Sequence, residues 1–591
     1  MAHADKPAAT SPSRISTTLT HFRYRLAHTD ALPQLALLGL VSGLATGLVA
    51  VAFRFAIEWP LALFLPSKNS EGFESLPIEA RLALPLIGMI FIALLMWGRT
   101  ESQRQCGVAH VIRRYQQHQG HLPASNGILQ FIGGSIAVLS GYSVGREGPA
   151  VHLGAACSSL LGQKFGLPNN SLRIMVGCGV AGAISASFNT PLAGVIFAME
   201  VVLMEYTVAG FIPIILASVS ATVVSRIFFG DAPAFEIPPL TMASLLELPF
   251  LVFCGIVIGL ASTLVLKLHQ FIQTLQSKTL ISRLIAAGLL TSLTGAFIPQ
   301  VMGLGYDTVE AAMLGTMSLN LLLIVVIAKL LLSTITIALG IPGGSIGPTL
   351  VVGACLGGAL GIIGASFSPE NSASSGFYAT VGMAAMMAGV LNAPLAALMT
   401  LVELTHNPAI VLPAMLVIVI ACITARMSTH LPGLFLVGNN PAHFTSPLSQ
   451  SLSRAGVTSL MSQSFISHSP LLPANQAGKL LEQHPDWIII ETDDKKTQEN
   501  VKFILHPSDL ARHMQTIEAD DSLTSTEINL LEIPGQRWHL HPIQAQATLQ
   551  EAHTLLRQKD GFAVGVLPQV STSNAEFIGI VTQDKINNYY Q

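Results

Sequence analysis

Gly145–Ala155 reads GREGPAVHLGA, and the same pattern returns at Gly344–Ala354 as GSIGPTLVVGA. A second pair of segments follows in the same order, because Asn189–Glu200 (NTPLAGVIFAME) matches Asn392–Glu403 (NAPLAALMTLVE). Each pair is separated by about 200 residues, which indicates an internally duplicated chain. The duplication predicts two halves, at about 32–228 and 246–440, with a site where they meet. The sequence does not show whether one half is inverted relative to the other.

The composition predicts that much of the surface faces lipid. Hydrophobic residues make up 51% of the 591 residues and charged residues only 11%, with a mean hydropathy of +0.57. Soluble domains carry roughly 25% charged residues. Uncharged windows long enough to cross a hydrocarbon core of about 30 Å occur at 31–53, 82–98, 208–225 and 248–266. A net charge of −3 gives no reason to expect a nucleic-acid partner.

The two ends of the chain differ from this apolar region of 32–440. Residues 1–31 are polar and contain arginines before the first span, which favours a cytoplasmic N-terminus. Residues 441–454 read as a polar linker containing Pro and Ser. Residues 455–591 are richer in charge, and we expect a soluble cytoplasmic α/β domain there. Its β-type runs are 487–491, 503–505, 562–567 and 577–581, with a helical stretch at 548–559.

The six cysteines form no Cys-x-x-Cys pair and fall in apolar surroundings. We interpret them as small buried hydrophobes, not as a disulfide or metal framework. They are Cys106, Cys157, Cys178, Cys254, Cys355 and Cys422. The stretch His539–His541 lacks the spacing of metal ligands, so we predict no metal there and interpret it as surface.

The segment Gly145–Pro149 is typical of an anion site. Its glycines let backbone N–H groups turn inward, and Pro149 suits the first turn of a helix, where its missing N–H costs nothing. A helix N-terminus carries about +0.5 elementary charge and free N–H groups, which together attract anions. The second copy, Gly343–Pro348, offers the same arrangement. Two such helix starts could replace the hydration shell of a small anion without binding it too tightly for release.

Glu147 is the exception in this segment, because a carboxylate in a membrane helix costs on the order of 2.5–3.5 kcal/mol. At an anion-attracting helix start, its side chain can occupy the place of the anion. Protonation would remove its charge and release it, so Glu147 is the expected proton-sensitive gate. The alternative is a structural ion pair between Arg146 and Glu147, although adjacent residues on a helix point in different directions.

The motifs resemble those of the CLC family of chloride channels and transporters. Gly145–Pro149 looks like the most diagnostic motif of that family, whose glutamate gates the pore, and Gly344–Pro348 resembles its second pore motif. The resemblance covers about 32–440. It implies an all-α polytopic membrane fold of about eighteen helices in two inverted halves, and a homodimer with one pore per subunit. The anion-binding residues that it implies are Cys106, Gly107, Gly145, Arg146, Gly148, Ser345, Ile346, Gly347 and Phe435.

This chain departs from the family pattern at three positions. Cys106 replaces a serine whose hydroxyl meets the anion, and a thiol is a weaker donor. The inner tyrosine of the family should lie near Leu434 or Phe435, but no tyrosine occurs between Tyr378 and Tyr589. These two changes predict weaker inner binding or altered selectivity among anions. Val201 stands where proton-coupled members commonly carry an internal glutamate.

Because valine cannot carry a proton, Val201 favours a channel-like chloride pore of the voltage-gated chloride channel family over strict exchange. The alternative is a chloride/proton antiporter of the same fold, since some exchangers lack that glutamate. A proton path would then use Glu147 and Glu200. We interpret Glu200 and its counterpart Glu403 as structural residues, hydrogen-bonded within the protein. Lys329 lies in an apolar run, and it adds long-range positive potential to the pore, snorkels to the membrane interface or is satisfied by the backbone.

The C-terminal region resembles a pair of CBS modules, at roughly 455–515 and 530–591. Such pairs often bind adenine nucleotides, and the candidate contacts are Thr582, Asp584 and Asp509. The usual Thr or Ser three residues before Asp is not kept, because Thr582 precedes Asp584 by two and His506 stands before Asp509. The alternative is a dimerising cytoplasmic platform with no cofactor.

Two other classes of function compete with anion transport. An intramembrane enzyme would need a nucleophile with a base, and no Ser-His, Cys-His or His-Glu-x-x-His pattern lies at membrane depth. A nutrient transporter would need polar side chains around an organic solute, whereas these motifs offer glycines and backbone amides. The sequence therefore predicts a multi-pass protein, with lipid and chloride as its partners, in the cell membrane, the inner membrane if bacterial.

Overall fold

A computed structural model describes the protein at residues 21–28, 31–65, 71–231, 235, 240–275, 279–367, 372–437, 447–493, 500–519, 527–568 and 576–590. The chain forms two compact units. The larger unit comprises Leu35–Gln163 and Leu172–His443. The smaller unit combines the residues up to Gln34 with Lys164–Ser171 and Phe444–Gln591.

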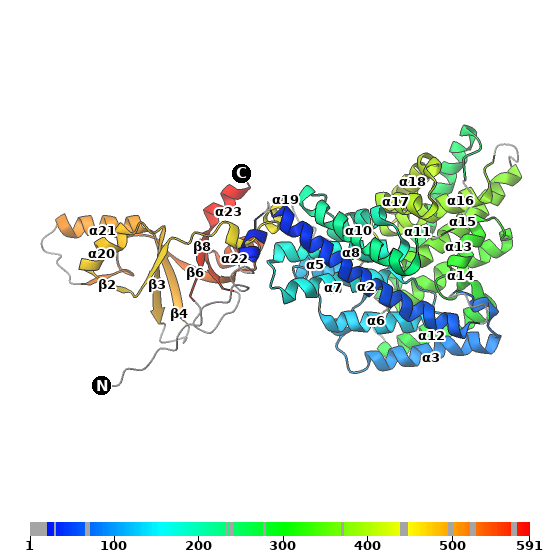
Figure 1. The fold of residues 1–591 in the computed structure, drawn as a ribbon, viewed down its shortest axis with the longest axis horizontal. Coiled ribbons are helices and arrows are strands. Elements are labelled where there is room, and N and C mark those ends of the chain that lie inside the picture. The colour runs from blue at the N-terminus through cyan, green and yellow to red at the C-terminus, as the bar shows by residue number, and fades with distance from the viewer. Residues whose placement is uncertain are drawn as a thin grey trace. The chain divides into compact units, whose positions relative to one another are not determined.

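The larger unit is built of helices (Figure 1). Its long helices are α2 (Leu32–Phe64), α3 (Ile78–Met96), α5 (Gly107–Gln117), α6 (Ala124–Leu139), α7 (Glu147–Lys164), α8 (Asn169–Phe188), α10 (Val208–Phe229), α11 (Leu248–Thr274), α12 (Leu280–Phe297), α14 (Leu319–Ala338), α15 (Ile346–Phe367), α16 (Ser375–Leu391), α17 (Pro394–Thr405) and α18 (Val411–Thr429). The short ones are α4 (Glu101–Arg104), α9 (Pro191–Phe197), continued by a π-helical segment at Ala198–Leu203, and α13 (Tyr306–Met313).

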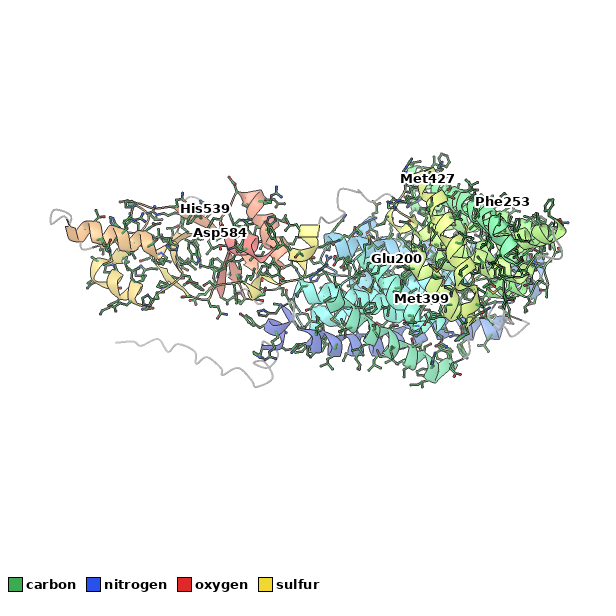
Figure 2. The ribbon with its side chains drawn as sticks, turned by 90° about the horizontal axis from the view of Figure 1, so that it is seen from above. Glu200, Phe253, Met399, Met427, His539 and Asp584 are labelled. Atoms are coloured by element: carbon green, nitrogen blue, oxygen red, sulfur yellow. The ribbon has the colours of Figure 1, made fainter. Side chains whose placement is uncertain are left out.

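The helices of this unit expose apolar side chains outward, as a protein in lipid does. Phe253 on α11 is 50% exposed and Met427 on α18 is 72% exposed, and both project from the edge of the unit (Figure 2). Within the described residues, nine helical segments are long and apolar enough to cross a membrane. The fold is thus that of a multi-pass membrane protein, as the composition predicts.

Within each half of the chain, glycines bring a corresponding pair of helices into close contact. A Cβ on Gly154 of α7 would lie 2.3 Å from the carbonyl oxygen of Gly179 on α8. In the second half, a Cβ on Gly353 of α15 would lie 2.5 Å from the carbonyl oxygen of Gly382 on α16. Small residues at such contacts allow backbones to approach closely in membranes. The sequence repeat is therefore also a repeat of helix packing.

The smaller unit carries a six-stranded sheet in the order β1-β3-β4-β6-β7-β8 and a separate pair of β2 with β5. The strands are β1 (Phe465–His468), β2 (Leu471–Pro473), β3 (Trp487–Asp493), β4 (Asn500–Leu505), β5 (Glu527–Asn529), β6 (Arg537–Gln544), β7 (Ala563–Leu567) and β8 (Gly579–Thr582). The helices are α19 (Pro447–Ser453), α20 (Ala474–Glu482), α21 (Pro507–Ala519), α22 (Leu549–Lys559) and α23 (Gln583–Tyr589).

The sheet repeats one β-α-β-β-α pattern. Strand β1 pairs in parallel with β3, which pairs antiparallel with β4, and β6, β7 and β8 repeat this arrangement. The pairing of β4 with β6 joins the two copies. This topology is compatible with a pair of CBS-like modules. The stretch expected to be a polar linker contains α19, and β6 includes His539, which is exposed as predicted.

Segments distant in sequence complete this smaller unit. The amide of Gly456 donates to the carbonyl oxygen of Ala27 at 2.9 Å, and the Asn170 side chain donates to the carbonyl oxygen of Leu26 at 2.9 Å. Asn169, at the start of α8, donates to the Glu551 carboxylate of α22 at 3.0 Å. The residues before the first span and the connection between α7 and α8 therefore pack with the C-terminal residues.

Candidate anion site between two helix starts

The two copies of the duplicated motif meet backbone to backbone. The amide of Gly145 donates to the carbonyl oxygen of Gly344 at 2.7 Å, and the amide of Gly344 donates to that of Gly145 at 2.8 Å. This antiparallel bridge joins equivalent residues of the two halves, as a local two-fold relation requires. It brings the beginnings of α7 and α15 together, so two helix N-termini with partial positive charge lie at one place.

Glu147 is the first residue of α7 and its side chain is fully buried beside this bridge. A Cβ on Gly145 would lie 2.5 Å from Glu147 Oε2, and a Cβ on Gly347 would lie 3.1 Å from it. Glycine at these positions therefore leaves the space that the carboxylate fills. Within the described residues, Oε2 accepts no hydrogen bond. The carboxylate thus lies where both helix starts attract negative charge, as its predicted role as a gate requires.

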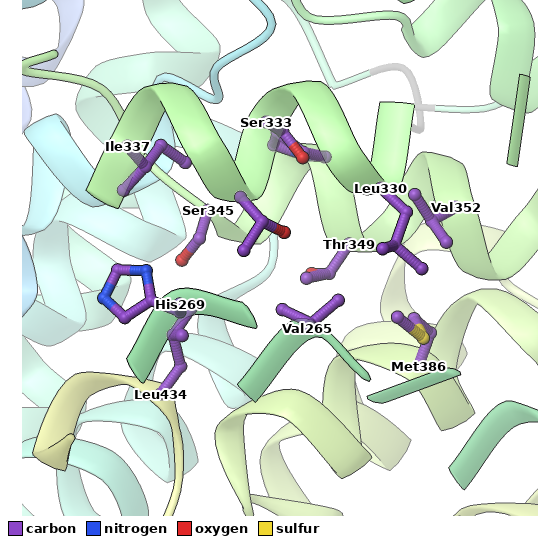
Figure 3. A pocket seen from close by; sticks show the side chains of 12 residues that line it. Val265, His269, Leu330, Ser333, Ile337, Ser345, Thr349, Val352, Met386 and Leu434 are labelled. Atoms are coloured by element: carbon purple, nitrogen blue, oxygen red, sulfur yellow. The ribbon is translucent and has the colours of Figure 1, made fainter. Parts of the chain in front are cut away.

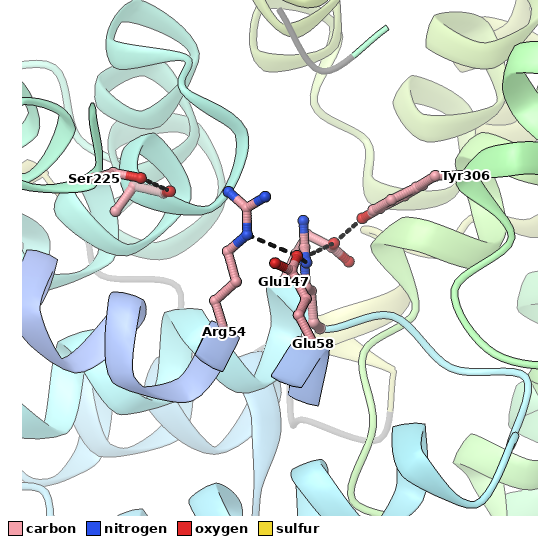
Figure 4. A network of polar contacts seen from close by, with 7 residues as sticks. Arg54, Glu58, Glu147, Ser225 and Tyr306 are labelled. Carbon is pink, nitrogen blue, oxygen red and sulfur yellow. Dashed lines mark hydrogen bonds and ion pairs between the residues drawn. The ribbon is translucent and has the colours of Figure 1, made fainter. Parts of the chain in front are cut away.

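The other carboxylate oxygen of Glu147 has a partner from the second half of the chain. The hydroxyl of Tyr306, the first residue of α13, donates a hydrogen bond to Glu147 Oε1 (Figure 4). A hydrogen bond to an ionised acceptor is about twice as strong as one between neutral groups. Tyr306 therefore stabilises the carboxylate in the buried position.

The guanidinium of Arg146 interacts mainly with Glu58 and only weakly with Glu147. Its guanidinium donates to Glu58 of α2 at 2.5 Å, while Arg146 Nε lies 4.0 Å from Glu147 Oε1. Arg54, one turn before Glu58, also donates to that carboxylate, at 2.7 Å (Figure 4). The Arg146 side chain is thus primarily a structural partner of Glu58. The sequence did not predict this ion pair between the segment before α7 and α2, and anion binding by Arg146 stays a prediction.

The loop before Tyr306 is held from two sides. Lys329, fully buried in α14, points its ammonium at the carbonyl oxygens of Val301, Gly303 and Leu304, at 3.3–3.4 Å. On the other side, the amide of Asp307 donates to a carboxylate oxygen of Glu71 at 2.9 Å. Of the interpretations of Lys329, the contacts therefore support the one in which backbone carbonyl oxygens satisfy its charge.

Gln130 of α6 connects the first helix start near Cys106 to the duplicated motifs. The amide of Gly107, in the left-handed conformation at φ +78°, donates to Gln130 Oε1 at 2.7 Å. The Gln130 amide donates to the carbonyl oxygen of Pro342 at 3.1 Å, and His152 Nδ1 lies 3.2 Å from Gln130 Oε1. The Gly107 amide, expected to contact the anion, is therefore already engaged by a side chain.

The duplicated acidic residues cap helices of the opposite half. Glu403 accepts from the amides of Leu192 and Ala193 at the start of α9, at 2.9 and 2.7 Å. Glu200 accepts from the amides of Leu395 and Ala396 at the start of α17, at 3.2 and 2.7 Å. Both are hydrogen-bonded within the protein, as the sequence analysis proposed. Val201 follows Glu200 in the π-helical segment and is buried among apolar residues.

The inner position assigned to Leu434 or Phe435 is a short 3₁₀ turn, Leu434–Leu436. Leu434 lines a pocket at the start of α15 together with Ser345, whereas Phe435 is partly buried against the main core. Ile346 is the first residue of α15 and is buried.

The candidate nucleotide residues lie at helix starts of the smaller unit. Thr582 ends β8 and caps α23 by accepting from the amide of Lys585 at 3.4 Å, and Asp584 is in the first turn of that helix. Asp509 lies in the first turn of α21. Within the described residues, no group of three or more His, Cys, Asp or Glu side chains could hold a metal ion.

Sequence reasoning did not identify Tyr306, Glu58 or Arg54. The last two had a usable signal, because Arg54 and Glu58 are charges one helical turn apart inside an otherwise apolar span. Tyr306 had none, since its contact with Glu147 joins residues 159 positions apart.

Known proteins resemble the chain mainly over its larger unit. A family model described as voltage gated chloride channel matches residues 87–426. The putative chloride channel protein ClcB-like of Ralstonia nicotianae is 30% identical over 414 residues, covering 68% of this chain and 94% of that protein. The H(+)/Cl(−) exchange transporter ClcA of Salmonella arizonae is 28% identical over 436 residues, covering 69% of this chain and 88% of that protein.

Solved structures share the fold. A slow cyanobacterial Cl−/H+ antiporter superposes with a TM-score of 0.59 at 21% identity, over 69% of this chain and 96% of its own. A CLC-type fluoride/proton antiporter gives 0.58 at 22% identity, over 69% of this chain and 98% of its own. A eukaryotic CLC transporter gives 0.54 at 16% identity and covers 96% of this chain and 98% of its own, so its likeness extends into the smaller unit.

Proposed function

This chain belongs to the voltage-gated chloride channel, or CLC, family of anion transport proteins, and on that premise we propose that it exchanges chloride for protons. The observation that carries the proposal is the position of Glu147. Its buried carboxylate lies at the two helix starts that attract anions, so a carboxylate and a chloride ion compete for one place.

Protonation links this competition to proton movement. A proton on Glu147 removes the negative charge that the two helix starts attract, and the side chain can then leave. A chloride ion takes its place, and the hydroxyl of Tyr306 becomes available as a donor. When the anion departs, the carboxylate loses its proton and returns. The anion and the ionised carboxylate therefore alternate at one position, and each replacement takes up or releases one proton.

The relatives favour exchange over the channel-like conduction that Val201 suggested. Similar proteins are named as H(+)/Cl(−) exchange transporters, and similar structures are titled as antiporters. One relative is named as a putative chloride channel protein, so the channel is the second candidate. Without an acidic side chain at Val201, exchange needs another inner proton route, and Glu200 is the nearest carboxylate in the sequence.

One liposome experiment distinguishes the two candidates. The purified protein is reconstituted, a chloride gradient is imposed, and the external pH is followed. Exchange predicts that chloride flowing down its gradient drives protons against theirs. A chloride current without uphill proton movement would leave the channel as the function.

Two features outside the anion site extend the proposal. We place the protein in the cell membrane as a homodimer with both termini in the cytoplasm, following the family resemblance; light scattering of the purified protein tests the dimer. We also propose that the smaller unit binds adenine nucleotide between its two β-α-β-β-α copies. Calorimetry with ATP tests this, and absence of heat would leave a platform without a nucleotide site.

A further inference from the structure

A small pocket lies at the start of α15, and none of its lining residues comes from α7 (Figure 3). It is therefore separate from the place that Glu147 occupies. Helices α11 and α14 and the start of α15 supply most of the wall, and α16 and the turn at Leu434 supply one residue each. The lining residues are Val265, His269, Leu330, Ser333, Thr334, Ile337, Ser345, Pro348, Thr349, Val352, Met386 and Leu434.

Ser345 contributes an unused hydroxyl to this pocket. The residue is only 8% exposed, and within the described residues its Oγ has no hydrogen-bond partner. Two other hydroxyls of the lining are engaged, because Ser333 donates to the carbonyl oxygen of Lys329 and Thr349 to that of Ile346, both at 2.6 Å. Thr334 brings one further hydroxyl to the wall. A buried polar atom without a partner is costly, so a ligand that accepts a hydrogen bond from Ser345 would remove that cost.

His269 supplies the second polar group. It is 8% exposed and lies on α11, inside a candidate membrane span. Its Nε2 lies 2.9 Å from the Gln273 amide nitrogen, which donates, so the ring proton is on Nδ1 and can be donated in turn. Figure 3 shows the Ser345 hydroxyl pointing toward the His269 ring.

The chemistry of the wall favours an anion. The pocket lies at the N-terminus of α15, a helix of 22 residues, whose partial positive charge attracts negative charge. No Asp or Glu lines the pocket, and Leu434 adds an apolar side without donors. Few donors in an otherwise apolar wall suit a weakly hydrated ion and do not suit a polar organic solute.

We propose that a halide ion binds in this pocket through the Ser345 hydroxyl and the His269 imidazole at the start of α15. The inference rests on the proposed function, because it adds a second anion position to the same transport path. It also supplies side-chain donors in a chain that has Cys106 in place of the expected serine and no tyrosine at Leu434 or Phe435.

Bromide locates the ion directly. Crystals of the full-length protein grown in bromide should show an anomalous peak within hydrogen-bonding distance of Ser345 Oγ. A peak confined to the Glu147 region, with only water beside Ser345, would overturn the inference.

Calorimetric titration of chloride into the full-length protein tests the donors. Ser345→Ala and His269→Phe should each weaken one binding event by about tenfold, the loss expected for a hydrogen bond to an ion. The matched control is Thr336→Val on the same helix α14, which does not line the pocket and whose hydroxyl already donates to the carbonyl oxygen of Leu332 at 2.8 Å. It should bind chloride within about twofold of the natural protein. Equal affinities in Ser345→Ala and Thr336→Val would overturn the inference.

Chloride-driven flux by the natural protein in liposomes distinguishes failure of the pocket inference from failure of the proposed function. If the protein transports chloride but shows no bromide beside Ser345, only the pocket inference fails. If it does not transport chloride, the proposed function fails, and a bromide peak would then support the pocket as a binding site alone.

Discussion

The hydroxyl of Tyr306, in the second half of the chain, donates to the buried carboxylate of Glu147, in the first half. Glu147, the proposed gate, is therefore held by a side chain that belongs to neither copy of the duplicated motif. Its anchor is the loop fixed by Lys329 and Glu71.

Removing this hydrogen bond should favour the open gate. Tyr306→Phe deletes the hydroxyl and keeps the ring, so chloride flux at neutral pH should rise, by about tenfold if the bond to the charged carboxylate is lost in full. Flux from liposomes measures this. The matched control is Tyr378→Phe. It removes a buried hydroxyl that donates to Glu247 at 2.8 Å and makes no contact with Glu147. Equal fluxes in both variants would contradict the role of Tyr306.

Deleting the gate carboxylate should remove the pH dependence of transport. Glu147→Ala leaves no group that competes with chloride for the helix starts, so flux should be insensitive to pH and no longer coupled to protons. Liposome flux across a range of pH, with external pH recorded, measures both properties. A variant that keeps the pH dependence of the natural protein would show that Glu147 is not the gate.

Glu71 should make thermal stability depend on pH near neutrality. Burial and the nearby Asp307 raise the pKa of this loop carboxyl from 4.5 to about 7. Between these values the folded protein binds more protons than the unfolded chain, so stability falls as pH rises through this window. Glu71→Gln keeps an acceptor for the Asp307 amide and removes the titration. The Tm of the variant should therefore change less between about pH 5 and about pH 8.

The Tm measurement also identifies the outcome that would contradict this role of Glu71. If Tm of the natural protein and of Glu71→Gln follow the same curve, Glu71 does not titrate in this window and serves only as an acceptor for the start of α13.

A stronger donor at Cys106 should tighten anion binding. Cys106 precedes α5 at its N-cap position, and its side chain packs against a buried cluster that Tyr306 also contacts. Cys106→Ser replaces a weak thiol donor by a hydroxyl, so chloride should bind up to about tenfold more tightly in calorimetry. Unchanged affinity would place Cys106 outside the anion site.

Variants of Glu200 and Glu403, which cap equivalent helices, test whether Glu200 has a structural role or carries protons. Glu200→Gln and Glu403→Gln each remove the charge from an equivalent cap, so both should destabilise the protein by about 1 kcal/mol. If Glu200 is structural, both variants keep the same proton coupling in liposomes. Loss of coupling in Glu200→Gln alone would assign Glu200 to the proton path.

Sequence repeats predicted the centre of this fold because they mark equivalent positions. From the two motifs it followed that the starts of α7 and α15 meet and that Glu147 is buried between them. The engagement of Arg146 by Glu58 and of Gly107 by Gln130 did not follow, because each depends on a side chain from another helix. The sequence did not predict strand β6, because Pro542 and the histidines at 539 and 541 obscure the run of apolar residues that is typical of a strand.

The exchange of caps between Glu200 and Glu403 makes the halves mutually dependent. A polypeptide containing only the first half would leave the start of α9 without its acidic partner and would offer Glu200 no helix to cap. Two separate copies of one half could, however, make the same exchange with each other. A half-length ancestor assembling as a pair, before gene fusion, would already have possessed this reciprocal contact.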